Sequence, residues 1–242
     1  MTAKNLLLLS SSRVAQTDYL AHAKMLIKEH LGDIKELLFI PFAGITIDYD
    51  QYTNMVKIAL AELNIKVTSI HQYSSAKEAI DNAQAIAVGG GNTFHLLYQL
   101  YQQDLIEAIQ EKVAKGTPYI GWSAGSNIAG ASIKTTNDMP IIEPTSFKAL
   151  GLVNFQLNPH YTDHNPPGHN GETREQRLAE FMVLNPEVPI VAIIEGSALI
   201  LRNNKLSLVI SEFIDDVGYV FKQGKKQLIN SATDLSYLLS DN

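Results

Sequence analysis

The sequence predicts an α/β protein with a doubly wound, mostly parallel sheet, and three observations lead to this fold class. Short apolar runs alternate with longer segments of helical periodicity over the first half of the chain. These runs are continuously apolar, which is typical of parallel strands that are buried on both faces. Glycine-rich turns at residues 89–92 and 121–125 directly follow two of the runs, as turns at the carboxyl ends of such strands do.

Strands and helices are expected to alternate up to the second glycine-rich turn. The apolar runs predict strands at residues 6–9, 37–40, 65–70, 85–88 and 118–121. Apolar residues at helical spacing predict helices at residues 19–27, 52–63, 93–101 and 105–114. Ser75 and Glu78 match a capping box, which begins one further helix between the third and fourth strands. Because helices of this kind join parallel strands by right-handed crossovers, one layered sheet is expected.

The second half of the chain is expected to extend this sheet with antiparallel strands. The alternating residues 153–157 predict a strand that leads into a polar loop at residues 160–172. Beyond the loop we expect a helix at residues 173–184, a buried strand at 190–194 and antiparallel strands from residue 198 to residue 221. No repeat, low-complexity segment or linker interrupts the sequence, so residues 1–242 are expected to form a single domain.

Composition narrows the possible functions. The chain has 242 residues, 45% of them hydrophobic, and a net charge of −6, which argues against a nucleic-acid-binding surface. It contains no cysteine, which excludes disulfides, thiol nucleophiles and thiolate metal sites. No apolar stretch approaches the ~20 residues of a membrane span, and the run at residues 6–9 is too short for a signal-peptide core. We therefore expect a soluble, cytoplasmic protein without nucleic-acid or membrane partners.

Ser123 is the candidate nucleophile. It lies at the centre of Gly-Trp-Ser-Ala-Gly, residues 121–125, after an expected strand and before small residues that are compatible with a helix. Such an elbow needs small neighbours because the turn is tight, and it exposes the serine hydroxyl at the end of the sheet. A serine nucleophile needs a base, usually an imidazole. His160 fits this role best, because it lies just past an expected strand at the start of the polar loop.

Two carboxylates are candidates to orient this base, and two backbone N–H groups are candidates to bind an oxyanion. Glu195 directly follows a buried strand, where a solvated surface charge is not expected. We favour it over Asp138, whose turn sequence also fits a capping aspartate. An oxyanion hole needs two donors. Ala124, which follows the nucleophile, and Gly91, in the glycine run, are the candidates.

No metal ion and no cofactor are expected. The polar loop holds His160, His164 and His169 with Asp163, which are residue types that bind zinc, but prolines and glycine among them remove any helical spacing. The glycine run could instead cradle a phosphate. A nucleotide- or phosphate-binding module is therefore an alternative function, although the chain has neither a P-loop nor a dinucleotide fingerprint.

Four segments carry motifs that are more specific together than the elbow alone. They are Gly-Gly-Gly-Asn-Thr-Phe at residues 89–94, Gly-Trp-Ser-Ala-Gly-Ser-Asn at 121–127, Asn-Pro-His-Tyr at 158–161 and Gly-Glu-Thr-Arg-Glu-Gln-Arg at 171–177. In this order they resemble the peptidase E family, the alpha-aspartyl dipeptidases among the serine peptidases. The resemblance implies a fold like that of class I glutamine amidotransferases. It also implies cytoplasmic hydrolysis of dipeptides with an N-terminal aspartate (Asp-Xaa), without a metal.

The resemblance also implies roles for individual residues. Ser123 matches the family's nucleophile and His160 its general base, while the acid matches either Glu195 or Asp138. The glutamate is favoured here for its position directly after a buried strand.

Asn92 and Arg174 resemble family positions near the substrate. A guanidinium can hold a carboxylate through two parallel hydrogen bonds, so Arg174 is the candidate that selects aspartate. Small Asp-Xaa peptides are therefore the expected partners, and the protein is expected to be a monomer or a homodimer. A related serine hydrolase, such as a cyanophycinase-like peptidase or an esterase, is the alternative enzyme.

Overall fold

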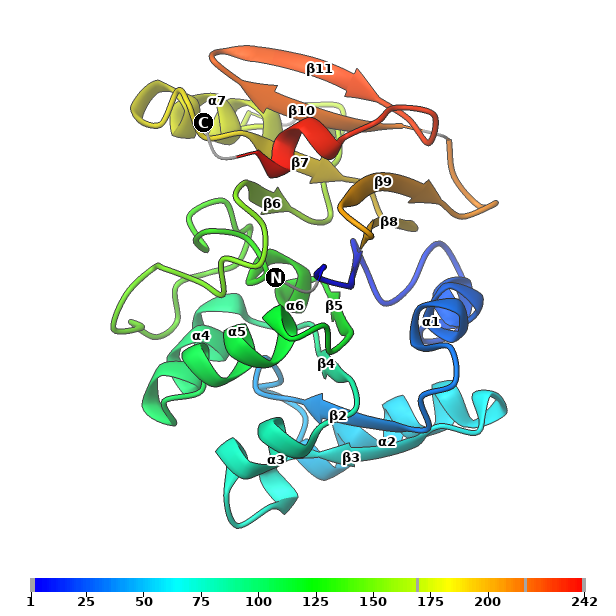
Figure 1. Ribbon diagram of the computed structural model, residues 1–242. Helices are drawn as coiled ribbons and strands as arrows, with labels where there is room; N and C mark the ends of the chain where they lie inside the picture. Colours follow the sequence, from blue (N-terminus) through cyan, green and yellow to red (C-terminus); the bar gives the residue numbers. More distant parts are fainter. Residues whose placement is uncertain (1–2, 169, 216, 241–242) are drawn as a thin grey trace.

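Two sheets organise the computed structural model, which describes residues 3–168, 170–215 and 217–240 (Figure 1). Among these residues, seven strands form a larger sheet in the order β3-β2-β4-β5-β1-β8-β9, and four form a smaller sheet in the order β11-β10-β7-β6. Figure 1 shows the smaller sheet at one end of the molecule, beside α7. The α/β class, with a mostly parallel sheet and an antiparallel C-terminal part, is confirmed.

The elements have the following bounds. The larger sheet contains β1 (Leu6–Leu9), β2 (Glu36–Ile40), β3 (Lys66–Ser69), β4 (Ile86–Val88), β5 (Tyr119–Trp122), β8 (Ser197–Arg202) and β9 (Lys205–Ile210). The smaller sheet contains β6 (Gln156–Asn158), β7 (Ile190–Ile193), β10 (Gly218–Lys222) and β11 (Lys225–Ile229). The helices are α1 (Lys24–Leu31), α2 (Tyr49–Leu60), α3 (Ala76–Asn82), α4 (Thr93–Gln102), α5 (Ile106–Ala114), α6 (Ala124–Asn127) and α7 (Arg174–Leu184), with short 3₁₀ turns at η1 (Ala21–Ala23), η2 (Ala61–Leu63), η3 (Ile70–Gln72) and η4 (Ser236–Leu239). None of the helices in the described ranges has the length and apolarity needed to cross a membrane.

The larger sheet is buried on both faces, as its continuous apolar runs predict. Leu6 and Leu8 of β1 pack on one face with apolar residues of α3, α4 and α5. Leu7 and Leu9 pack on the other face with residues of α1 and α2. The strands β3, β2, β4, β5 and β1 are all parallel. Their carboxyl ends therefore lie along one edge of the sheet, where the two glycine-rich turns are found.

The later strands do not all extend the larger sheet, which differs from the expectation from the sequence. Only β8 and β9 join it, as a hairpin antiparallel to β1. The expected strand at residues 190–194 forms β7, which pairs in parallel with β6 in the smaller sheet. β6, α7 and β7 form a crossover unit of their own, which places β7 beside β6. A strand buried in either sheet has the same kind of apolar sequence, so the sequence alone does not indicate which sheet it joins.

Helix α2 begins three residues before its predicted start. The Asp48 side chain accepts a hydrogen bond from the Gln51 backbone N–H at 2.7 Å and so caps the helix at that point. The helix after Ser123 is shorter than its small residues suggest, since α6 has only four residues.

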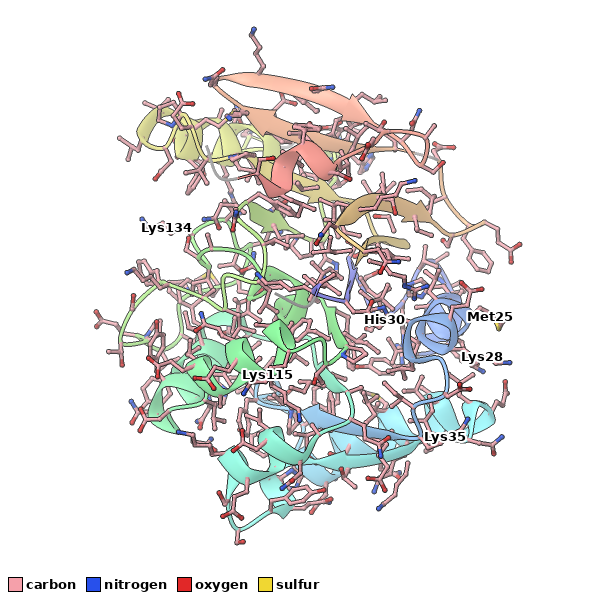
Figure 2. The ribbon with its side chains drawn as sticks, in the orientation of Figure 1. Met25, Lys28, His30, Lys35, Lys115 and Lys134 are labelled. Carbon is pink, nitrogen blue, oxygen red and sulfur yellow. The ribbon has the colours of Figure 1, made fainter. Side chains whose placement is uncertain are left out.

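His30 is buried at the end of α1, against the larger sheet. Figure 2 shows it on the inner side of α1, whereas Met25 and Lys28 lie on the outer side. The His30 Nε2–H donates to the Tyr119 carbonyl oxygen at 3.1 Å. Burial, with a smaller effect of nearby Arg202, lowers the pKa of His30 to about 4, although this hydrogen bond opposes the change. The imidazole is therefore neutral in the folded protein at neutral pH.

We expect the free energy of unfolding to fall as the pH is lowered from about 6.5 to about 4, because the unfolded chain then binds a proton that folded His30 does not. The loss should reach at most about 3 kcal/mol at the low end of this range. Urea unfolding of the wild type and of His30→Gln at several pH values measures it. The glutamine variant should lose less stability over this range, while His164→Gln, which changes an exposed histidine, should follow the wild type. Equal slopes for His30→Gln and the wild type would contradict the assignment.

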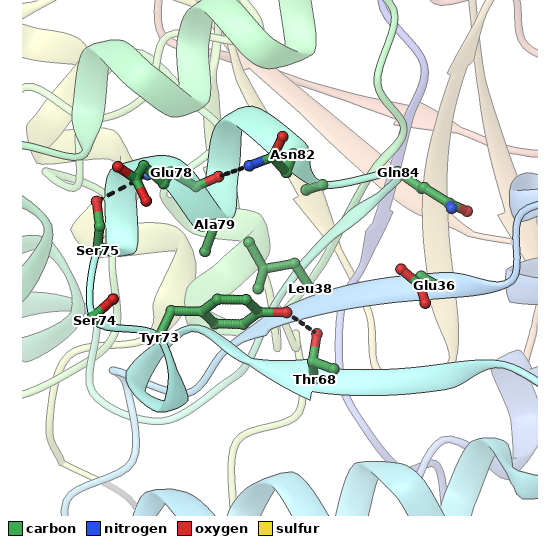
Figure 3. A pocket seen from close by; sticks show the side chains of 11 residues that line it. Glu36, Leu38, Thr68, Tyr73, Ser74, Ser75, Glu78, Ala79, Asn82 and Gln84 are labelled. Carbon is green, nitrogen blue, oxygen red and sulfur yellow. Dashed lines mark hydrogen bonds between the residues drawn. The ribbon is translucent and has the colours of Figure 1, made fainter.

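A polar pocket lies between α3 and the strands β2 and β3 (Figure 3). Its wall includes Glu36, the first residue of β2, and residues of α3. Glu36 is already paired with Lys66 at 2.9 Å, and the Tyr73 hydroxyl donates to Thr68 Oγ1 at 3.2 Å. The pocket brings together no serine and histidine, so the candidate site lies instead at the carboxyl ends of the strands.

Candidate active site

Ser123 lies at a sharp turn between β5 and α6. Its backbone has φ 54° and ψ −114°, a left-handed φ that few residues other than glycine adopt. A side-chain carbon at Gly121 would lie 2.3 Å from the Gly125 carbonyl oxygen, and one at Gly125 would lie 2.1 Å from the Val88 carbonyl oxygen. Both glycines are therefore required by close backbone approach, as the elbow sequence predicts.

His160 and Glu195 complete a chain of hydrogen bonds that begins at Ser123. The His160 Nε2 atom lies 2.8 Å from the Ser123 hydroxyl oxygen, and His160 Nδ1 lies 2.7 Å from Glu195 Oε1. A carboxylate only accepts hydrogen bonds, so Nδ1 carries the proton and Nε2 accepts from the serine. The His160 and Glu195 side chains are 37% and 57% exposed, so the pair is open to solvent at the mouth of the site.

Ser123 and the other two residues come from different sheets. Ser123 follows β5 of the larger sheet, while His160 follows β6 and Glu195 follows β7 of the smaller one. The segment after β1 joins them: Ser10 Oγ donates to the Ile193 carbonyl oxygen at 2.8 Å and accepts from the His160 N–H at 2.9 Å. The sequence analysis missed this residue, whose signal is its place at the carboxyl end of a central strand.

Asp138 lines the same cavity as the three residues but makes other contacts. Its Oδ2 atom accepts from the Thr93 N–H at 2.7 Å and from the Thr93 hydroxyl at 2.6 Å, at the start of α4. These are the contacts of a residue that stabilises a helix N-terminus. Asn92 caps the same helix, since its Oδ1 accepts from the His95 N–H at 3.0 Å and its Nδ2 donates to the Met139 carbonyl oxygen at 2.9 Å.

Two cavities meet at Ser123 and His160. One is lined by Asp138, Arg174 and Glu195, and the other by the glycine run and Asn92. Arg174 is half-buried at the first position of α7, whose N-terminus is capped by the Thr173 and Gln176 side chains. Burial and the charge of Arg177 lower the pKa of Arg174, while Asp138 opposes this change. The guanidinium thus shares the cavity with the nucleophile.

Gly91 lines the second cavity together with Ser123, and Ala124 directly follows Ser123 in the chain. Gly91 has φ +137°, and a side-chain carbon there would lie 2.2 Å from the Ala43 carbonyl oxygen, so only glycine fits. Within the described part of the chain, the backbone N–H groups of Gly91 and Ala124 have no hydrogen-bond acceptor. Both donors remain available to a ligand.

Lys226 of β11 ties the polar loop to α7, which sequence reasoning missed. Its Nζ atom donates to Asp163 Oδ1 at 2.6 Å and to Glu175 Oε2 at 2.8 Å, and it lies 4.3 Å from the centroid of the Tyr219 ring. Partial burial acts to lower the pKa of Lys226, but these hydrogen bonds raise it well above its usual range. The ammonium therefore stays charged and holds the loop after His160 against the helix that carries Arg174.

The structure describes two of the three histidines of the polar loop, His160 and His164. His160 Nε2 and Nδ1 are both engaged as described above, and His169 lies outside the described residues. In the ranges that the structure describes, no group of three or more His, Asp or Glu side chains is arranged to hold a metal ion.

Comparisons with known proteins identify the family. The model of Peptidase family S51 matches residues 6–209. The chain is 54% identical to peptidase E of Shewanella putrefaciens (strain CN-32 / ATCC BAA-453) and 50% identical to peptidase E of Shewanella oneidensis, in each case over 97% of this chain and 98% of the relative. Among solved structures, it is similar to a peptidase E-like protein of Listeria monocytogenes EGD-e, with a TM-score of 0.64, 27% identity and coverage of 86% of this chain and 99% of that one. A peptidase of an acI-B1 Actinobacterium, at 17% identity and a TM-score of 0.67 over 96% of both chains, shares the fold. The resemblance of the four motifs to peptidase E is confirmed, and the chain belongs to peptidase family S51.

Proposed function

We propose that this chain is a serine dipeptidase that hydrolyses Asp-Xaa dipeptides through an acyl-enzyme on Ser123, and that it acts in the cytoplasm. The observation that carries this function is the chain of hydrogen bonds from Ser123 through His160 to Glu195, at 2.8 and 2.7 Å. Serine, imidazole and carboxylate in this order form the arrangement that activates a hydroxyl for acyl transfer. Membership of a peptidase family supports a peptide bond as the target.

The reaction follows from the positions of these groups. Ser123 Oγ attacks the carbonyl carbon of the aspartyl residue while His160 Nε2 takes the hydroxyl proton. Negative charge develops on the carbonyl oxygen, where the N–H groups of Gly91 and Ala124 can donate to it. His160 then gives its proton to the leaving amine, and the second amino acid departs. Water, deprotonated by His160, attacks the ester and releases aspartate.

Glu195 and Asp138 have different roles in this proposal. Glu195 keeps the proton of His160 on Nδ1 and stabilises the imidazolium that forms during each proton transfer. Asp138 stabilises the first turn of α4 through Thr93 and thereby holds the glycine run and Asn92 in place. Asn92 contributes to substrate binding through the second N–H of its amide, since the first donates to the Met139 carbonyl oxygen.

Arg174 selects aspartate at the first position of the dipeptide. Two acidic residues close to it in the chain are engaged elsewhere: Glu172 Oε2 lies 3.5 Å from Arg177 Nε, and Glu175 Oε2 lies 2.8 Å from Lys226 Nζ. Across the described ranges Arg174 itself makes no ion pair. A half-buried guanidinium without a partner can bind the substrate carboxylate through two hydrogen bonds.

Arg174→Met is expected to lower kcat/KM for Asp-Leu on the order of a hundredfold or more, because a carboxylate is then left in the cavity without its partner. The preference for Asp-Leu over Asn-Leu should narrow. The assay measures kcat/KM on Asp-Leu, Glu-Leu, Asn-Leu, N-acetyl-Asp-Leu and an aspartyl ester, for the wild type and the variant. Arg177→Met, one turn along the same helix, is the matched control and should stay within about threefold, as expected for an exposed ion pair.

The same substrate panel separates the alternatives. Efficient cleavage of the ester alone would point to an esterase, and cleavage of N-acetyl-Asp-Leu in preference to Asp-Leu would point to a different peptidase of this fold. An unchanged preference in Arg174→Met would mean that another cation binds the aspartate. Stabilisation by nucleotides without hydrolysis of any peptide would favour the phosphate-binding alternative.

A further inference from the structure

We propose that the Tyr52 hydroxyl is a positioning group for the oxyanion hole: it fixes the peptide unit between Gly90 and Gly91 so that the Gly91 N–H faces the reacting carbonyl. This inference rests on the proposed function, in which Gly91 donates to the oxyanion. Tyr52 lies on α2, far along the chain from the glycine run. Its hydroxyl donates to the Gly90 carbonyl oxygen at 2.8 Å.

Because of the geometry of a peptide unit, the hydrogen bond from Tyr52 to the Gly90 carbonyl oxygen also fixes the direction of the Gly91 N–H. The Gly90 carbonyl and the Gly91 N–H belong to one planar, trans peptide unit, so they point in opposite directions. A hydroxyl that binds the carbonyl on the Tyr52 side therefore directs the N–H to the other side. Gly91 lines the second cavity together with Ser123, and its N–H has no acceptor among the described residues, so the N–H is available to a carbonyl bound at Ser123.

The Tyr52 hydroxyl has only one direction in which to donate. Its oxygen accepts from the Tyr19 hydroxyl at 3.3 Å, and Tyr19 in turn accepts from the Trp122 Nε1–H at 2.9 Å. A phenol has one hydrogen, and because Tyr19 donates to the Tyr52 oxygen, the Tyr52 hydrogen is left for Gly90. Burial raises the pKa of Tyr52, so the hydrogen is retained at neutral pH. Trp122 directly precedes Ser123, so the same network joins the elbow to the glycine run.

The glycine run needs such an external contact. Three successive glycines have more accessible backbone conformations than any other tripeptide, so their peptide units rotate easily unless they are held. A side-chain carbon at Gly89 would lie 2.6 Å from the Tyr52 hydroxyl oxygen, which shows how closely the run packs on this tyrosine. If the peptide unit turned over, its carbonyl oxygen would face the oxyanion and repel it.

The test is Tyr52→Phe, which removes the hydroxyl and keeps the ring that packs on Phe39 at a centroid distance of 5.0 Å. We expect kcat for Asp-Leu to fall by about ten- to a hundredfold, part of what loss of a whole oxyanion donor costs, with KM within about twofold. The affinity for an aspartyl aldehyde, whose adduct with serine carries an oxyanion, should fall by a similar factor. The affinity for free aspartate, whose α-carboxylate places only part of a negative charge on each oxygen, should fall by less than the affinity for the aldehyde.

The matched control is Tyr49→Phe, which removes a hydroxyl from the same helix. The Tyr49 ring packs against Phe42 and His71, and Tyr49 is not among the described residues that line the second cavity, so kcat should stay within about twofold of the wild type. Rates are normalised to the folded fraction by circular dichroism, so a loss of stability in Tyr52→Phe does not count as a loss of kcat.

Three outcomes would overturn the inference. In the first, Tyr52→Phe keeps the wild-type kcat and aldehyde affinity. In the second, its loss lies in KM and in aspartate affinity, which would mark Tyr52 as part of the binding wall only. In the third, the wild type forms no aldehyde adduct on Ser123, and the proposed function then fails together with this inference. An adduct in the wild type with an unchanged Tyr52→Phe overturns the inference alone.

Discussion

Ser123→Ala is expected to lower kcat for Asp-Leu by roughly four to six orders of magnitude, because the acyl-enzyme cannot form without the hydroxyl. The change removes one oxygen atom, and alanine tolerates the φ of 54° at this position about as well as serine does. The variant should therefore fold like the wild type. The turnover number of the purified variant measures the loss of kcat. Its mass after treatment with a reagent that acylates active-site serines shows whether the acyl-enzyme can still form.

Ser126→Ala is the matched control for this experiment. Ser126 lies one turn beyond the elbow, and its hydroxyl donates to the Leu9 carbonyl oxygen at 2.6 Å. We expect this variant to lose about 1 kcal/mol of stability and little of its kcat, because only a structural hydrogen bond is removed. If Ser123→Ala kept more than about a tenth of the wild-type rate, far above what loss of a triad member leaves, Ser123 could not be the nucleophile.

The second large effect is expected for Glu195→Gln, which should lower kcat by about two to four orders of magnitude. An amide binds either tautomer of His160, so the proton is no longer kept on Nδ1 and the imidazolium loses its counter-charge. Because Glu195 is 57% exposed, water screens part of this charge, and for that reason the expected range begins about two orders of magnitude below the wild type rather than four.

Asp138→Asn is the comparison for Glu195→Gln, because the two variants together test which carboxylate orients His160. The asparagine keeps an oxygen for the Thr93 N–H and hydroxyl, which donate to Oδ2 at 2.7 and 2.6 Å in the wild type. We expect a loss of stability of about 1 kcal/mol, typical of a weakened helix cap, and a kcat within about tenfold of the wild type. Steady-state kinetics and thermal melting of both variants measure this. The reverse ranking of kcat would assign the acid to Asp138.

The fold was predictable where burial leaves a simple pattern. Strands β1, β4 and β5, and β2 after Glu36, are continuously apolar because both faces of the larger sheet are covered there, and the helices repeat apolar residues at helical spacing. The sheet to which β7 belongs was not predictable, because the sequence of an apolar strand does not indicate which strand it pairs with. The start of α2 depended on the single capping side chain of Asp48.

The site was predictable where function depends on a local turn or on the end of a strand. Ser123 directly follows β5, His160 and Glu195 lie two residues beyond the ends of β6 and β7, and the structure brings the three side chains together. Tyr52 and Lys226 could not be found in this way. Tyr52 meets Gly90 across 38 positions of the sequence, and Lys226 meets Asp163 across 63. Neither has a neighbouring residue that predicts the contact.

The division of the site between two sheets links catalysis to the way the sheets dock. Ser123 moves with the larger sheet, while His160 and Glu195 move with the smaller one, and Ser10 lies at the junction. A relative displacement of about 1 Å would break the serine–imidazole hydrogen bond while every strand kept its own partners. The enzyme can therefore be inactive and still fully folded by the measure of its secondary structure. Its activity therefore depends on how closely the larger and smaller sheets dock against each other.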